Sequence, residues 1–179
     1  MSSRSKRAGK LAARDAAELG LMSALMVATQ FALSFIPNVH LTAVLIVVTA
    51  VVFGWSAMYS VLVYVMLEGL MYGFGVWWVS YLYAWPLLCA VAVVLRKNDL
   101  PSLLWAAVTG GHGLLFGALC ALPYVSLSGF PAAVSYWISG IPFDLVHCIS
   151  NFILTLVLVR PLIGAARKLR AHGDHTQAE

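Results

Sequence analysis

The sequence predicts an all-α membrane protein, a bundle of six transmembrane helices with both termini in the cytoplasm. Hydrophobic residues make up 61% of the 179 positions and charged residues only 10%, with a mean hydropathy of +0.89. A soluble domain carries about 25% charged residues, so the composition excludes that class as well as disordered and collagen-like chains. Because a helix that crosses a bilayer needs roughly 20 apolar residues, six helices would occupy about two thirds of this chain.

Turn-forming residues and charges divide the apolar part of the chain into six segments. The first ends at Ile36-Pro37-Asn38, because proline cannot continue the helical hydrogen-bond ladder and restricts the residue before it. The third ends at the glycines of 73–75, the fourth at the charged loop 96–99, and the fifth at the polar stretch 126–131. The predicted segments are 17–36, 39–54, 56–74, 77–95, 100–124 and 133–160.

The boundary between the second and third segments depends on the distribution of charge. Residues 41–67 contain no charge, and only Gly54-Trp55-Ser56 indicates a turn there. With a turn at this point, the amino tail, the Arg96-Lys97 loop and the carboxyl tail all fall on one side, and the opposite loops contain no Lys or Arg. Positive-inside counting therefore favours six helices over five and places both termini in the cytoplasm.

Three regions are predicted along the chain: a basic cytoplasmic tail at 1–16, the membrane domain at 17–165 and a polar cytoplasmic tail at 166–179. Most of the eleven cations lie beside apolar segments, where attraction to anionic lipid explains them, so we expect the lipid bilayer as a partner and no nucleic acid. The apolar run Leu19–Ile36 is longer than the core of a signal peptide and lacks an A-x-A site, which predicts a retained helix.

Small residues mark the places where helices can approach closely. Ala24, Ala28 and Ala32 form a small-xxx-small stripe, and G-x-x-x-G motifs begin at Gly69 and Gly113. Such patterns let helix backbones pack within a bilayer. Packing inside the bundle is the default interpretation, and a docking face for another protein is the alternative.

Buried polar residues are the next candidates for function. Glu68 and Asp144 are acids inside apolar segments, and each would cost about 2.5–3.5 kcal/mol at the bilayer centre. His147 and Asn151 follow Asp144 at i+3 and i+7, so these three side chains share a helix face. The stripe is either an internal hydrogen-bond network or part of a ligand site. The roles of Glu68 and of His112 stay open.

An aromatic face begins the fourth segment. Trp77, Tyr81 and Trp85 share one side of a helix, and Trp137 lies near the start of the sixth segment. An interfacial aromatic belt is the default explanation, but eight residues rise about 12 Å, so the three rings cannot all lie at headgroup depth. A wall of rings that descends into the bundle suits a flat heterocycle. The pattern therefore predicts a ligand pocket open to the outside.

Motifs for catalysis are absent from the sequence. It contains no H-E-x-x-H, G-x-S-x-G or G-x-x-x-x-G-K-[ST], so we predict no catalytic residues and no ATP hydrolysis by this chain. Three cysteines, Cys89, Cys120 and Cys148, lie in separate apolar segments without metal-ligand spacing. We therefore expect them to form no metal site and no disulfide.

Several stretches together resemble the substrate-specific S components of energy-coupling-factor (ECF) transporters. They are 34–42 (SFIPNVHLT), Trp77-Trp78 with 81–88 (YLYAWPLL), and 136–147 (YWISGIPFDLVH). The basic amino tail followed by the alanine stripe is similar to the first helix of that family. The resemblance covers roughly residues 17–165.

This resemblance implies a multi-pass protein of a bacterial or archaeal cytoplasmic membrane that captures a vitamin or related micronutrient from outside. In that family the S component docks on a transmembrane coupling subunit that carries two cytoplasmic ABC ATPases, then topples to release its substrate. ATP is used by the partner subunits only, and the chain itself needs no cofactor. Ala24, Ala28 and Ala32 become the docking face. The implied substrate-binding residues are Asn38, Trp77, Tyr81, Trp85, Trp137, Asp144 and His147.

The sequence departs from the better-known riboflavin, thiamine and biotin binders of that family, because the pocket residues of those proteins cannot be placed in it, so the substrate stays open. Two other classes of function also stay open. One is a structural membrane scaffold similar to the rod-shape-determining membrane proteins. The other is an intramembrane enzyme that uses Asp144 and His147.

Overall fold

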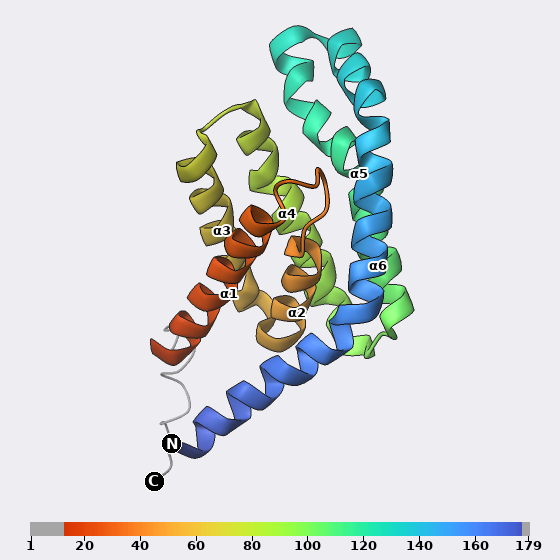
Figure 1. Cartoon of the computed structure of the whole chain (residues 1–179). Coiled ribbons are helices and arrows are strands. Elements are labelled where there is room, and N and C mark those ends of the chain that lie inside the picture. Colours follow the sequence, from red (N-terminus) through yellow and green to blue (C-terminus); the bar gives the residue numbers. More distant parts are fainter. Residues whose placement is uncertain (1–12, 177–179) are drawn as a thin grey trace, which may run out of the picture.

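Helices account for every regular element in the structure, a computed structural model that describes residues 13–176. The all-α prediction is therefore confirmed, while most of the predicted basic tail and residues 177–179 lie outside the described range. The elements are α1 (Ala13–Ala32), α2 (Thr42–Phe53), the 3₁₀ turn η2 (Gly54–Ser56), α3 (Ala57–Tyr72), α4 (Val76–Leu95), the 3₁₀ turn η3 (Arg96–Asn98), α5 (Ser102–Ser128) and α6 (Phe130–Thr176) (Figure 1).

Four stretches of the described chain are long and apolar enough to cross a membrane, judged by length and composition. They are Thr42–Tyr72, Val76–Asn98, Ser102–Ser128 and Phe130–Ala171. A span needs roughly 20 predominantly apolar residues, and each of these stretches exceeds that length. The architecture is thus a bundle of helices with the composition of a membrane protein.

The stretch Thr42–Tyr72 contains two helices that run in opposite directions. They are joined by η2, at the boundary that the sequence predicted, and Gly54 has a φ of +62°, a conformation that favours glycine. At the other end of the pair, the hydroxyl groups of Thr42 and Tyr64 both donate to Oε1 of Gln30, over 3.2 and 2.6 Å. The start of α2 therefore lies near the middle of α3.

The short helix α2 forms the centre of the bundle. Residues 42–50 are all buried, and their sequence TAVLIVVTA is uncharged. A helix that is apolar on every side is typical of a protein core or a membrane span, and α2 lies in the core, in contact with α1, α3, α4, α5 and α6. This arrangement explains why the second segment shows no polar face.

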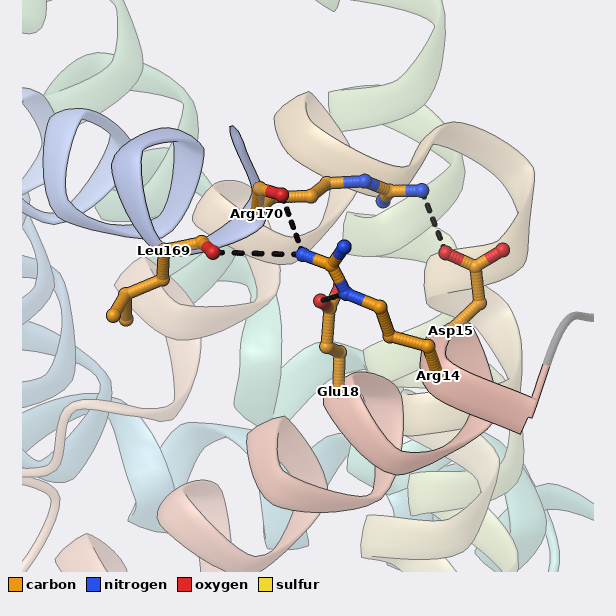
Figure 2. Close-up of polar contacts among 5 residues, drawn as sticks. All are labelled: Arg14, Asp15, Glu18, Leu169 and Arg170. Atoms are coloured by element: carbon orange, nitrogen blue, oxygen red, sulfur yellow. Dashed lines mark hydrogen bonds and ion pairs between the residues drawn. The ribbon is translucent and has the colours of Figure 1, made fainter. Parts of the chain in front are cut away.

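The start of α1 and the last part of α6 are fastened together by polar contacts (Figure 2). Asp15 accepts a hydrogen bond from Arg170 over 2.6 Å, and Arg14 donates to the backbone carbonyl groups of Leu169 and Arg170. Arg14 also pairs with Glu18 over 2.7 Å. These partners let both helices extend into polar sequence.

The observed helix ends therefore differ from the predicted ones. α1 begins at Ala13 and ends at Ala32 instead of covering 17–36, and α6 runs through the predicted polar tail to Thr176. α6 also begins at Phe130, because a single residue, Gly129 with a φ of +85°, turns the chain after α5. α6 bends along its length (Figure 1), and it contains Pro142 and Pro161, which interrupt the helical hydrogen-bond ladder.

Helices α5 and α6 pack closely along a row of glycines. A Cβ atom on Gly113 would lie 2.8 Å from the backbone carbonyl carbon and oxygen of His147, and one on Gly117 would meet the carboxyl group of Asp144. The G-x-x-x-G motif at Gly113 therefore packs two helices of this bundle, which is the default interpretation of the sequence. The glycine Gly69 of the other motif lies against the side chains of Phe74 and Trp78.

Candidate functional site

A cavity of about 320 Å³ lies at the end of the bundle where α1 ends, away from the contact between Arg14 and Arg170. The loop 33–40 forms much of its wall. The rest comes from the ends of α1 and α3, the start of α4, and one residue each from α5 and α6. The site therefore depends on the packing of distant segments around a loop that the Pro37-Asn38 turn shapes.

A network of hydrogen bonds holds the acid of this cavity, Glu68. Gln30 accepts bonds from the hydroxyl groups of Tyr64 and Thr42 at its Oε1, so its amide nitrogen is oriented toward Glu68. That nitrogen donates to Glu68 Oε2 over 3.0 Å. Glu68 Oε1 has no hydrogen-bond partner among the described residues, and the Glu68 side chain is 1% exposed. Glu68 is therefore a positioned carboxyl group with one buried oxygen that no described residue bonds.

Two histidines also line the cavity. The rings of His40 and His147 lie edge to face with centroids 4.9 Å apart, and within the described chain His40 Nδ1 and His147 Nε2 have no hydrogen-bond partner. His40 belongs to the loop before α2, outside the candidate spans. Burial, reinforced by the nearby His112, lowers the pKa of the His40 imidazole from 6.5 to about 4, so the ring is neutral near pH 7.

Only part of the aromatic face of α4 lines the cavity. Trp77 and Tyr81 line the cavity with ring centroids 5.0 Å apart. Trp85, one turn deeper, does not line the cavity and is completely buried, with the rings of Phe116 and His147 packed over it at 5.1 and 6.2 Å. The sequence placed Trp85 in direct contact with the ligand; in the structure it supports the residues that form the site.

Asp144 faces a second, neighbouring cavity of about 360 Å³. Asn38 and Phe116 line both cavities and so separate them. Asp144 Oδ1 accepts a hydrogen bond from the backbone N–H of Gly117 over 2.8 Å, and Oδ2 has no partner in residues 13–176. Asp144 and His147 are therefore buried on one face of α6 but belong to different cavities, and Asp144 is not bonded to His147 as an acid–base pair would be.

The remaining predicted site residues lie as follows. Asn38 is tied to α6, because its side chain donates to the carbonyl of Phe143 over 3.3 Å and its own carbonyl accepts from Ser150 over 2.8 Å. Trp137 is 41% exposed and lines neither cavity. Its neighbour Tyr136 faces the second cavity instead, since consecutive helical residues point about 100° apart. The structure does not bring Trp137 to the site.

Several cavity residues were missed by the sequence analysis as ligand contacts: Gln30, His40, Glu68 and Phe116. Glu68 carried a usable signal, since an acid inside an apolar segment needs a partner or a function. Gln30 carried the same signal more weakly as an amide in the first apolar run. Phe116 had none, because its position at the partition between the cavities depends on how α5 packs.

The alanine stripe lies on the outer face of α1. Ala24, Ala28 and Ala32 are exposed, and so is Gly20, which precedes them at the same spacing of four. A Cβ atom on Gly20 would meet no atom within 4 Å, so packing within this bundle does not require a glycine there. The stripe is therefore exposed along the length of α1.

The cavity can bind a small molecule through rings and through three buried polar atoms. Among the residues that the structure describes, no three His, Cys, Asp or Glu side chains are grouped so that they could hold a metal ion. Comparison of the chain with protein-family models, curated proteins and solved structures finds no match. The geometry of the cavity itself is therefore the basis for inferring what the protein does.

Proposed function

We propose that this chain is the substrate-binding subunit, or S component, of an ECF-type importer. It captures a small ring-containing micronutrient from outside the cell in the 320 Å³ cavity. It then delivers the molecule inward through a membrane-embedded coupling subunit and two ABC ATPases, which alone use ATP. The chain itself performs no catalysis and needs no cofactor.

One observation carries this proposal: three residues that line one aromatic cavity each have a buried polar atom without a hydrogen-bond partner among the described residues. These atoms are Glu68 Oε1, His40 Nδ1 and His147 Nε2. A buried polar atom that lacks a hydrogen bond costs about 1–3 kcal/mol, so three in one place are expensive for a purely structural protein. In a receptor, a ligand supplies the missing partners and the rings enclose it.

The distribution of charge supports an even number of crossings, with both termini in the cytoplasm. Arg170 lies over the ring of Phe53, beside η2, and the guanidinium of Arg96 lies against Gly54, so cations of two distant segments meet at the turn between α2 and α3. The loop 33–41 and the turns before α4 and α6 contain no Lys or Arg. By the positive-inside rule the basic end faces the cytoplasm and the cavity faces outward in the membrane of a bacterium or archaeon.

The exposed face of α1 supports docking to a partner. Small side chains permit close helix approach in a bilayer. The stripe Gly20, Ala24, Ala28 and Ala32 is exposed on the bundle, and a Cβ atom on Gly20 would meet no atom within 4 Å. A coupling subunit that covers this face would connect the receptor to its ATPases.

The proposal is tested by isolating what the protein binds. The full chain is purified in mild detergent, denatured, and its small molecules identified by mass spectrometry, with a Phe116→Trp variant that crowds the partition between the cavities as the comparison. We expect one ring-containing compound at a stoichiometry near one, depleted in the variant, and calorimetric binding when it is added back. If no compound copurifies and none is taken up by cells, the structural scaffold becomes the better explanation.

A further inference from the structure

We propose that the molecule bound in the first cavity is a small planar cation whose positive group binds Glu68. This inference rests on the proposed function and deepens it by naming the chemical class of the substrate. It follows from the charge, the hydrogen bonds, the rings and the volume of the cavity.

The charge of the cavity wall is one-sided. Glu68 is an acid, and no Lys or Arg is among the described residues that line this cavity. A buried carboxylate without a positive partner is strongly unfavourable, whereas a cation placed beside it restores the balance. A ligand with a carboxylate or phosphate group would instead face Glu68 without any basic side chain to receive it.

The hydrogen bonds leave one oxygen of Glu68 for the ligand. Thr42 and Tyr64 donate hydrogen bonds to the side-chain carbonyl oxygen of Gln30, which fixes the amide group, and the Gln30 amide nitrogen then donates a hydrogen bond to Glu68 Oε2. Glu68 Oε1 is buried and without a partner among residues 13–176. The bond from Gln30 thus holds the carboxyl group in place before the ligand arrives, so binding does not have to order this side chain.

The remaining walls also suit a flat cation. Trp77, Tyr81, Tyr72 and Phe116 line the same cavity, and the faces of aromatic rings attract positive charge. The volume of about 320 Å³ equals that of about ten water molecules in the liquid, which corresponds to one or two fused rings with short substituents. His40 and His147 each add a ring nitrogen that can complete the hydrogen bonds of the ligand.

The test uses three planar probes of equal size that differ in charge: benzamidine (cation), benzamide (neutral) and benzoate (anion). Their dissociation constants for the full chain in detergent are measured by calorimetry. We expect benzamidine to bind at least ten-fold more tightly than the other two. In the Glu68→Gln variant, which can still accept the bond from Gln30, this preference should fall below about three-fold.

The matched control is Glu18→Gln, the same change at a glutamate that pairs with Arg14 at the other end of α1. This variant should keep the full preference for benzamidine. Because the probe series on the unmodified chain needs no variant, the inference remains testable even if Glu68→Gln does not fold.

The outcomes separate this inference from the proposed function. If benzoate or benzamide binds as tightly as benzamidine, or if Glu68→Gln keeps the preference, the inference is wrong while a receptor function stands. Copurification of a neutral or anionic ligand would likewise contradict the inference and leave the receptor function standing. If none of the three probes binds and no compound copurifies, both the inference and the proposed function fail.

Discussion

Replacing Gly113 by alanine should separate α5 from α6, whereas the same change at Gly111 should not. A Cβ atom on Gly113 would lie 2.8 Å from the carbonyl carbon and oxygen of His147, both of them backbone atoms that no side-chain rotation can move. A Cβ atom on Gly111 would meet nothing within 4 Å. The two positions are on the same helix, so Gly111→Ala is a matched control.

The expected magnitude follows from this geometry. Ordinary contacts begin at 3.4 Å, so the helices must part by about 0.6 Å at Gly113. Overpacking of this kind costs about 1–3 kcal/mol. Both variants gain roughly the same 0.5–1 kcal/mol from replacing a helical glycine, and that term cancels in the comparison. Gly113→Ala should therefore be about 1–3 kcal/mol less stable than Gly111→Ala.

Thermal unfolding of the two variants in the same detergent and at the same scan rate measures this difference. For a chain of this size 1 kcal/mol shifts the midpoint by about 2–4 °C, so Gly113→Ala should melt about 2–12 °C below Gly111→Ala. Because His147 also lines the cavity, the ligand affinity of Gly113→Ala should fall as well. Equal midpoints for the two variants would refute the close packing of α5 on His147.

Three further predictions concern topology, docking and pH. A reporter inserted in the turn 73–75 should be accessible from outside the cell and one at the carboxyl end should not; the reverse result contradicts the proposed orientation. Ala28→Trp should abolish uptake by cells that contain the coupling subunit while leaving ligand binding intact. The control Leu70→Trp, at a side chain of α3 that is 69% exposed, should allow uptake. Loss of binding in Ala28→Trp would argue against an outward-facing stripe. The pKa of His40 is about 4 in the folded chain and about 6.5 in the unfolded chain, so on acidification the unfolded chain binds the proton first. The free energy of unfolding should therefore decrease by about 3 kcal/mol from pH 6.5 to pH 4, and this contribution should be constant above pH 6.5. Melting of His40→Gln over the same pH range should lack this part of the decrease, and identical pH profiles for the two proteins would show that burial does not lower the pKa.

Much of the fold could be predicted from local sequence. The apolar composition and the long uncharged runs indicate helices in a membrane. The turn at Gly54-Trp55-Ser56 was predicted because a reversal of the chain there places the basic tails and the Arg96-Lys97 loop on the same side of the membrane. The ends of α1 and α6 could not be found in this way. Arg14 and Arg170 are polar and suggest tails, but their mutual contacts across the bundle let both helices continue.

The candidate site was predictable only in part. Asn38, Trp77, Tyr81 and His147 do meet at one cavity, because a turn and a helical face bring them to one end of the bundle. Helical periodicity gave the side of α4 on which Trp85 lies, but not that Phe116 of another helix would cover it. Whether Asp144 faces the same cavity as His147 depends on the rotation of α6 against α5, which the spacing of residues does not determine.

The contact between Asp15 and Arg170 joins positions that are 155 residues apart in the chain. Proteins are synthesised at about 5–20 residues per second, so roughly 8–30 s pass after Asp15 is made before its partner exists. During that interval α1 has α2 and α3 as neighbours, but the last turns of α6 have not yet been added. The contact between α1 and α6 can therefore form only after Arg170 has been synthesised, and a chain truncated before Leu169 lacks the bonds from Arg14 and Arg170 that join the two helices.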